Sequence, residues 1–321
     1  MQIKHVTCYG SGLIGAGWAT TFAMAGGLDI TVYDLDREKL DAARANIQRE
    51  LEFLVTEDVL TQEECRSKLE SVRFTTDPAE ALAQADFIQE STPEKLELKQ
   101  QIIRDIEAYC RPDAIIASST SGLLISDITA KAQHPERIVG GHPYTPVYLV
   151  PLVEMTGSEV TAPQNLQAAY DFYKRIGKEP VILRKAVPGF ISNRLQVALL
   201  REAVDLVNNG VCSIDEVDRA LCYGPGLRMA LMGPHAIFQL AGGAYGIHGA
   251  LLHLGAAMPY WLRDMASWTE MPGMYQDPAL IQKLTNEALA LRTAEQGRDT
   301  TGLMKFRDKG LVTLLRYHGK L

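Results

Sequence analysis

The chain has 321 residues, of which 46% are hydrophobic and 22% are charged, and its formal net charge is −7. This length and composition predict a globular protein with two domains. The negative charge argues against nucleic acid or an anionic membrane surface as the main partner, and no apolar run approaches the ~20 residues of a membrane span. The five cysteines form no C-x-x-C pair. They are typical of reduced thiols in the cytoplasm, and we expect no metal site.

The beginning of the chain has the pattern of a dinucleotide-binding fold. An apolar strand over residues 3–9 leads directly into the motif G-S-G-L-I-G at residues 10–15, which opens a helix of small residues. A second apolar strand over residues 29–34 closes with an acid, Asp34. A strand, a glycine turn, a helix, a strand and an acid in this order predict a Rossmann-type unit.

Each part of the glycine motif has an expected role toward the cofactor. Gly10 permits the tight turn, Gly12 lets the backbone approach the pyrophosphate, and Gly15 lets the helix pack on the strand. Leu13 and Ile14 lie at the helix N-terminus, where backbone N–H groups and the helix dipole favour a diphosphate.

Asp34 indicates which dinucleotide is bound. Its carboxylate is expected to hydrogen-bond the hydroxyls of the adenosine ribose, and it would repel a 2′-phosphate. Leu35 follows it, and we interpret the nearby cation, Arg37, as solvated or lying against adenine. The pattern therefore favours NAD over NADP.

The next segment continues the α/β pattern. Residues 35–73 combine charged and apolar residues at helical spacing, which predicts two surface helices separated near residues 56–61. Residues 85–91 predict another strand, followed by a helix that runs to Tyr109.

The central stretch places polar groups at the ends of three short apolar segments. Ser121 follows the first segment, His142 follows the second, and Glu154 closes the third. In an open α/β sheet, ligands bind at the carboxyl ends of the strands. The predicted strands cover residues 114–117, 137–141 and 151–154.

Two interpretations of this polar set are open. A histidine that is hydrogen-bonded to a carboxylate makes a general base of fixed tautomer, and a nearby hydroxyl can hold a substrate oxygen. The alternative is that a backbone carbonyl satisfies His142 and that Glu154 is exposed on a strand. The nucleotide-binding half upstream favours the first interpretation.

The pattern changes after the last predicted strand, residues 179–185. Pro188-Gly189-Phe190 interrupts it, and the sequence beyond is predicted to be all-helical, with Asn193 in the first turn of a long apolar helix. We therefore predict an α/β protein. Its Rossmann-type doubly wound sheet covers residues 1–186, and an all-helical C-terminal domain covers residues 187–321.

These motifs together resemble the 3-hydroxyacyl-CoA dehydrogenase superfamily over essentially the whole chain. That family has a serine in an S-N-T-S-like loop, a histidine in an H-x-x-N-P turn, a glutamate twelve residues later, and an asparagine in P-G-F-x-x-N-R. The matching residues are Ser121, His142, Glu154 and Asn193. The resemblance implies that His142 is the base, that Glu154 orients it, and that Ser121 and Asn193 hold the substrate oxygen.

The resemblance also implies contacts to NAD. Glu94, Lys99 and Ser121 match positions that contact the cofactor in that family. From the residues alone, a first-turn acid that favours the helix dipole and a solvated lysine are an equally good reading of Glu94 and Lys99. Where the family has the asparagine of H-x-x-N-P, this chain has Thr145. Thr145 can donate a hydrogen bond to the nicotinamide region but reaches less far.

Two further features concern the substrate. Aligned without gaps from Asp34, the serine and lysine that contact coenzyme A in the family fall at Glu50 and Glu57, and carboxylates would repel this polyanion. The motif G-L-R-M-A at residues 226–230 resembles the branch that holds L-carnitine dehydrogenase and L-gulonate 3-dehydrogenase, the lambda-crystallin type. Arg228 is then a candidate partner of a substrate carboxylate, and an arginine packed at the domain interface is the alternative.

The resemblance therefore implies NAD-dependent oxidation of the 3-hydroxyl of a small free 3-hydroxy carboxylate. L-Carnitine, giving 3-dehydrocarnitine, is the expected substrate. L-Gulonate, a 3-hydroxyacyl-CoA such as 3-hydroxybutyryl-CoA, and a non-enzymatic NAD-sensing protein on the same fold stay open as alternatives. By analogy with the family, the helical domain is expected to bind substrate and to form a homodimer.

Overall fold

The computed structural model describes residues 3–269, 282 and 295–321. The chain divides into two compact units. The first unit comprises Met1–Ser192 together with Asp308–Leu321, and the second comprises Asn193–Arg307.

The end of the chain belongs to the first unit, whereas the sequence assigned it to the helical domain. The reason is a small apolar cluster in which Val312 and Leu315 are buried together with Leu54 and Leu149. The hydroxyl of Tyr148 also donates a hydrogen bond to Asp308 Oδ2 at 3.1 Å. Because these partners are far apart in the sequence, periodicity along one segment could not reveal them.

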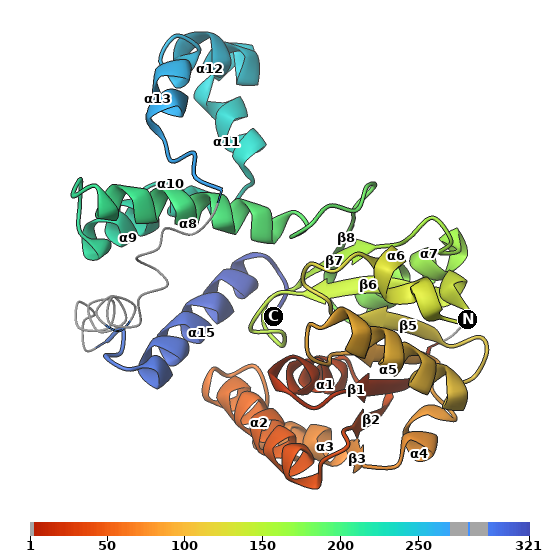
Figure 1. Ribbon diagram of the computed structural model, residues 1–321. Helices are drawn as coiled ribbons and strands as arrows, with labels where there is room; N and C mark the ends of the chain where they lie inside the picture. The colour runs from red at the N-terminus through yellow and green to blue at the C-terminus, as the bar shows by residue number, and fades with distance from the viewer. Residues whose placement is uncertain (1–2, 270–281, 283–294) are drawn as a thin grey trace. The chain divides into compact units, whose positions relative to one another are not determined.

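One eight-stranded sheet forms the centre of the first unit, in the order β3-β2-β1-β4-β5-β6-β7-β8 (Figure 1). Its first six strands have the order of a doubly wound dinucleotide-binding sheet, as predicted. Neighbouring strands are parallel except β6 and β7, which pair antiparallel. The strands are β1 (His5–Tyr9), β2 (Asp29–Tyr33), β3 (Val72–Thr75), β4 (Phe87–Glu90), β5 (Ile115–Ser118), β6 (Ile138–Pro143), β7 (Leu152–Thr156) and β8 (Glu179–Ile182).

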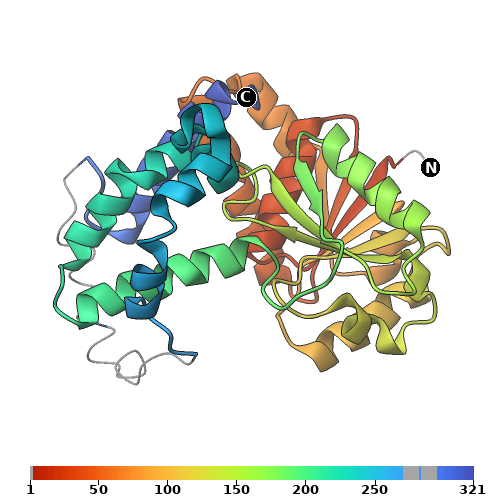
Figure 2. The same ribbon diagram turned by 90° about the horizontal axis from the view of Figure 1, so that it is seen from above.

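Helices cover both faces of the sheet, as the view from above in Figure 2 shows. Ile115 and Ala117 are buried in the cluster with α1, α2, α3 and α7, whereas Ile116 is buried in the cluster with α4, α5 and α6. The central strands are mostly apolar because each of their faces is covered. The helices are α1 (Leu13–Ala25), α2 (Arg37–Thr56), α3 (Gln62–Glu70), α4 (Pro78–Leu82), α5 (Leu96–Tyr109), α6 (Ile125–Ile128), α7 (Pro163–Arg175) and the 3-10 turns η1 (Thr129–Lys131) and η2 (Pro135–Arg137).

Several short elements were not predicted, among them β3 and α4. β3 is a four-residue strand at the edge of the sheet, and it exposes Arg73, so its apolar alternation is weak. α4 has five residues, beginning at Pro78 after the N-cap Asp77. An element of that length shows no helical periodicity in the sequence.

The second unit is helical in its described part, as predicted. Ser213 begins α9 with a capping box to Glu216, and prolines begin α10, α11 and α13. None of the described helices combines the length and the apolar character needed to cross a membrane. The elements are α8 (Ser192–Asn208), α9 (Ile214–Tyr223), α10 (Pro225–Met229), α11 (Pro234–Ala241), η3 (Gly243–Tyr245), α12 (Gly246–Leu254), α13 (Met258–Asp264) and α15 (Thr300–Tyr317), whose end lies in the first unit.

Candidate active site

Several candidate residues of the first unit lie in loops at the carboxyl ends of four neighbouring strands. β1, β4, β5 and β6 are parallel, so the loops that follow them meet at one edge of the sheet. The glycine turn follows β1, Glu94 follows β4, Ser121 follows β5 and Thr145 follows β6. Thr145 is exposed in its loop. The topology thereby gathers segments that lie far apart in the sequence.

The glycine turn has a geometry that requires glycine at two of its positions. Gly10 has a φ of +101°, and a Cβ on Gly15 would lie 1.9 Å from the backbone oxygen of Gly10. A Cβ on Gly12 would meet nothing within 4 Å, so the space beside Gly12 is open to a group from outside the chain. α1 begins at Leu13 without a side-chain cap or an acid in its first turn. These residues therefore fit a diphosphate bound by backbone N–H groups.

Asp34 directly follows β2 and is partly buried against the glycine turn. Its Oδ2 accepts hydrogen bonds from the backbone N–H of Ser11 at 3.0 Å and from Ser11 Oγ at 2.8 Å. The carboxylate therefore holds the turn in place. Its contact with the adenosine ribose stays a prediction.

Glu94 fixes the loop that carries Ser121. Its Oε1 accepts hydrogen bonds from Thr120 Oγ1 at 2.6 Å, from Ser121 N at 2.9 Å and from Gly122 N at 3.1 Å. Burial raises the pKa of the Glu94 carboxyl, but these hydrogen bonds and the charge of Lys99 outweigh burial and lower it. The ionised carboxylate thus keeps the serine loop in one conformation, while the Ser121 side chain is exposed.

Lys99 lies in a buried ion pair. Its side chain is 1% exposed, and its Nζ lies 2.9 Å from Glu90 Oε1 and 3.6 Å from Glu94 Oε2. It also donates to the backbone oxygen of Thr92 at 3.1 Å. Lys99 therefore offsets part of the charge of these two acids, and its direct contact with a cofactor stays a prediction. Sequence reasoning missed Glu90; the available signal was a carboxylate that ends the apolar strand F-I-Q-E.

His142 and Glu154 form a buried pair across the antiparallel strands β6 and β7. The two residues are directly opposite each other in the register, and His142 Nδ1 lies 3.0 Å from Glu154 Oε2. A carboxylate accepts hydrogen bonds, so Nδ1 donates to it, which leaves Nε2 as the acceptor of the neutral ring. The ring of Phe190 packs beside the imidazole, with 5.5 Å between the ring centroids.

Glu154 has further partners that the sequence did not reveal. Its Oε1 accepts hydrogen bonds from the backbone N–H groups of Ile191 at 2.8 Å and Ser192 at 2.9 Å, and Ser192 Oγ donates to Oε2. Burial raises the pKa of the Glu154 carboxyl, but the hydrogen bonds from His142, Ser192 and Ile191 outweigh burial and lower it to about 2. The carboxylate is therefore ionised at neutral pH.

The other two candidates belong to the second unit. Asn193 is the second residue of α8, directly after Ser192, and it is the first residue of the unit. Arg228 lies on the short helix α10 and is the basic residue of its last turn. Their roles toward the substrate stay predictions.

Glu50 is half-buried and has a partner inside the first unit, and its contact with the substrate stays a prediction. Thr20 Oγ1 donates a hydrogen bond to Glu50 Oε2, and burial raises the pKa of the Glu50 carboxyl to about 7. Buried positions of α2 include Ile47 and Leu51, and helical spacing places residue 50 beside this stripe. Repulsion of coenzyme A by an exposed carboxylate at Glu50 is therefore no argument about the substrate.

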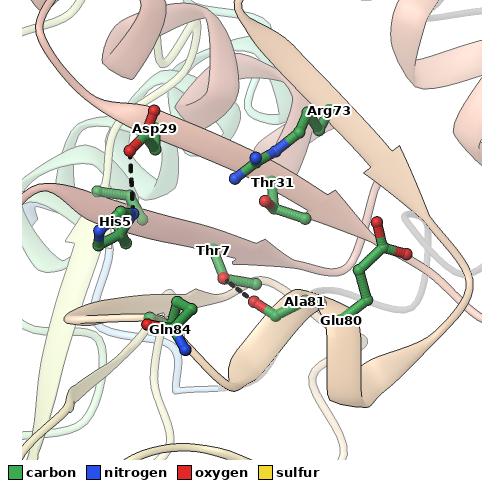
Figure 3. Close-up of a pocket in the computed structure, with 10 residues that line it drawn as sticks. His5, Thr7, Asp29, Thr31, Arg73, Glu80, Ala81 and Gln84 are labelled. Atoms are coloured by element: carbon green, nitrogen blue, oxygen red, sulfur yellow. Dashed lines mark hydrogen bonds and ion pairs between the residues drawn. The ribbon is translucent and has the colours of Figure 1, made fainter.

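A small polar cavity lies at the opposite end of the strands (Figure 3). Its volume is about 160 Å³, and its lining includes His5 and Asp29 at the amino ends of β1 and β2. His5 Nδ1 lies 3.0 Å from Asp29 Oδ2, and the side chain of Arg73 points into the same space (Figure 3). The cavity is thus separate from the edge that carries His142.

Comparison with known proteins agrees with this geometry. The family model for the NAD binding domain of 3-hydroxyacyl-CoA dehydrogenase matches residues 5–187, and the model for its C-terminal domain matches residues 189–297. L-Carnitine dehydrogenase of Pseudomonas syringae pv. syringae (strain B728a) is 40% identical over 98% of this chain and 94% of its own length. L-Carnitine dehydrogenase of Streptomyces griseus subsp. griseus is 38% identical over 100% of this chain and 91% of its own.

Solved structures show the same likeness. The NAD+ dependent dismutase 5-formyl-3-hydroxy-2-methylpyridine 4-carboxylic acid 5-dehydrogenase has a TM-score of 0.79 and 28% identity, over 99% of this chain and 98% of that one. The 3-hydroxybutyryl-CoA dehydrogenase of Escherichia coli K12 has a TM-score of 0.66 and 32% identity, over 75% of this chain and 50% of that one. Both family models together span nearly all of the sequence, and the resemblance is confirmed: the chain belongs to the 3-hydroxyacyl-CoA dehydrogenase family.

Proposed function

We propose that this protein catalyses the NAD-dependent oxidation of the 3-hydroxyl of L-carnitine to 3-dehydrocarnitine. The observation that carries the proposal is the buried His142–Glu154 pair, 3.0 Å apart, at the sheet edge of the NAD binding domain. L-Carnitine dehydrogenases that are 37–40% identical over at least 98% of this chain support the choice of substrate.

The base is His142 in this proposal. Its Nε2 accepts the proton of the substrate hydroxyl, because Nδ1 is engaged with Glu154. The ionised Glu154 stabilises the imidazolium that forms. Ser121 and Asn193 hold the substrate oxygen while it changes from hydroxyl to carbonyl. Bound NAD would supply the hydride acceptor, so that the carbon that bears the hydroxyl would lose a hydride as the hydroxyl loses its proton to His142, and the two-electron oxidation balances.

The glycine turn and its neighbours would hold the cofactor. The N–H groups of Leu13 and Ile14 would bind the diphosphate beside Gly12, and Asp34 would bind the adenosine ribose. Glu94 would act through the loop that carries Ser121. That loop and Thr145 would lie beside the nicotinamide.

The second unit would supply the substrate pocket. L-Carnitine has a carboxylate at one end and a quaternary ammonium at the other. Arg228 is our candidate partner of the carboxylate. The quaternary ammonium cannot donate hydrogen bonds, so aromatic faces are its main specific partners, at ~0.5–2 kcal/mol each. The unit offers exposed rings for this role at Tyr223, Tyr245, Tyr260 and Trp261.

A panel of NAD-linked oxidations tests the proposal. The substrates are L-carnitine, L-gulonate, 3-hydroxybutyrate and 3-hydroxybutyryl-CoA, and NADH formation is followed at equal protein concentration. L-Carnitine is expected to give the highest kcat/KM. Turnover of L-gulonate or the thioester with none of L-carnitine would move the substrate to that class and leave the dehydrogenase reaction standing.

We further propose that the protein is a homodimer in the cytoplasm. The described helices of the second unit expose many apolar side chains, which indicates a surface that a second copy covers. The five cysteines are all free thiols, as expected in a reducing compartment. Light scattering coupled to gel filtration should give twice the chain mass of 35.4 kDa. The side chains that are at least half exposed include Leu195, Val197, Leu240, Leu252 and Leu262.

A further inference from the structure

One carboxylate holds both the base and the beginning of α8. Glu154 Oε2 lies 3.0 Å from His142 Nδ1 and also accepts the hydroxyl of Ser192. Glu154 Oε1 accepts the N–H groups of Ile191 and Ser192, at 2.8 and 2.9 Å. The imidazole and the serine hydroxyl therefore share one oxygen atom.

The backbone before Ser192 is bent in a way that brings these donors together. Gly189 has a φ of +73°, and Phe190 has a φ of +49°, a region that residues with a side chain rarely adopt. Phe190 is 1% exposed, and its ring packs beside His142. The segment thus turns sharply, covers the imidazole and directs the N–H groups of Ile191 and Ser192 at the same carboxylate.

We propose that Ser192 is a positioning residue that tunes the proton affinity of His142 through the oxygen of Glu154 that the two residues share. The proposal rests on His142 being the base of the proposed function. A hydroxyl that donates to a carboxylate stabilises its negative charge and draws it away from other partners. With Ser192 in place, Glu154 stabilises the imidazolium less than it would alone, so the proton of the imidazolium is held less tightly.

The alternative is that Ser192 is only a helix cap, and the chain offers a matched control for it. Ser213 begins α9, and its hydroxyl donates to Glu216 Oε2 at 2.8 Å. Ser213 and Ser192 thus make the same type of bond at the beginning of a helix, but Glu216 has no imidazole partner among the described contacts. A cap affects stability and leaves the titration of His142 unchanged.

The test compares the pH profile of kcat/KM for the unmodified protein with the profiles of Ser192→Ala, Ser192→Thr and Ser213→Ala. The acid limb is the range in which kcat/KM falls as the pH is lowered. In Ser192→Ala we expect this limb to move to higher pH by on the order of 0.5 unit, because Glu154 then stabilises the imidazolium more strongly. Ser192→Thr keeps a hydroxyl and should restore the original limb. Ser213→Ala should leave the limb unchanged.

An acid limb that stays in place or moves to lower pH in Ser192→Ala overturns the proposal. If Ser192→Ala does not fold, Ser192→Cys decides the question, because a thiol is a weaker donor and should give a smaller shift in the same direction. An NMR titration of the His142 imidazole in the same variants measures the shift without turnover. The NMR titration needs no substrate. It therefore tests the role of Ser192 even if L-carnitine is not oxidised.

Discussion

His142 is the residue on which the proposed chemistry depends most directly. In His142→Ala, kcat for L-carnitine is expected to fall by about 10²–10⁴-fold, the usual contribution of a general base. NAD affinity should change little, because the glycine turn is not altered. The control is His134→Ala, which removes an exposed histidine that lies 3.4 Å from Glu136. Near-normal turnover of His142→Ala would contradict the assignment.

The choice of cofactor depends on a second residue, Asp34. We expect the unmodified protein to prefer NAD over NADP, because a 2′-phosphate would lie against this carboxylate. Asp34→Ala should lower the ratio of kcat/KM with NAD to kcat/KM with NADP. Asp36→Ala is the matched control, because Asp36 is an exposed N-cap that accepts a hydrogen bond from Glu38 N. Equal efficiency with both cofactors before any substitution would show that Asp34 does not select between them.

Glu154 also predicts a pH dependence of stability. Its pKa in the folded protein is lowered to about 2, below the value of about 4.3 for an unfolded glutamate. A lowered pKa stabilises the fold above pH ~4.3, and this contribution disappears as the pH falls toward 2. The free energy of unfolding of the unmodified protein should thus exceed that of Glu154→Gln near neutral pH, and the difference should shrink as the pH falls toward 2. Denaturant titrations at several pH values measure this difference. A difference that is constant down to pH 2 would contradict the low pKa.

At the scale of the element, the glycine turn before α1 gives a prediction about local geometry. Gly15→Ala would place a Cβ 1.9 Å from the backbone oxygen of Gly10, so the turn must shift. NAD binding, measured by calorimetry, should weaken by at least tenfold. Gly310→Ala is the control, because its Cβ would meet nothing within 4 Å inside α15. That variant should bind NAD normally and gain up to about 1 kcal/mol of stability.

The elements differ in how well the sequence predicts them. The glycine turn and the central strands could be predicted because each depends on a local pattern of residues. The antiparallel pairing of β7 with β6 could not, since strand direction depends on the connection between them. This direction places Glu154 opposite His142. Ser192 and Glu90 were missed for the same reason, because their roles depend on partners that are distant in the sequence.

At the scale of the whole molecule, the first unit depends on the end of the chain. A protein ending at Arg307 would lack Val312 and Leu315, and Leu54 and Leu149 would lose their apolar cover. Burial of one such side chain contributes ~1.5–3 kcal/mol, so we expect the melting temperature to fall by several degrees. Removal of Lys320 and Leu321 alone deletes a surface ion pair to Glu179 and should change it little. Equal melting temperatures for the long truncation and the intact chain would contradict this role.

The division of the first unit into two segments also has a consequence during synthesis. A ribosome makes Met1–Ser192 first, but Asp308–Leu321 emerges only after the second unit. At about 5–20 residues per second, translation of the second unit takes on the order of ten seconds. Throughout that interval the nascent sheet domain carries an uncovered apolar patch at Leu54 and Leu149, so it cannot complete its folding before the second unit has been synthesised.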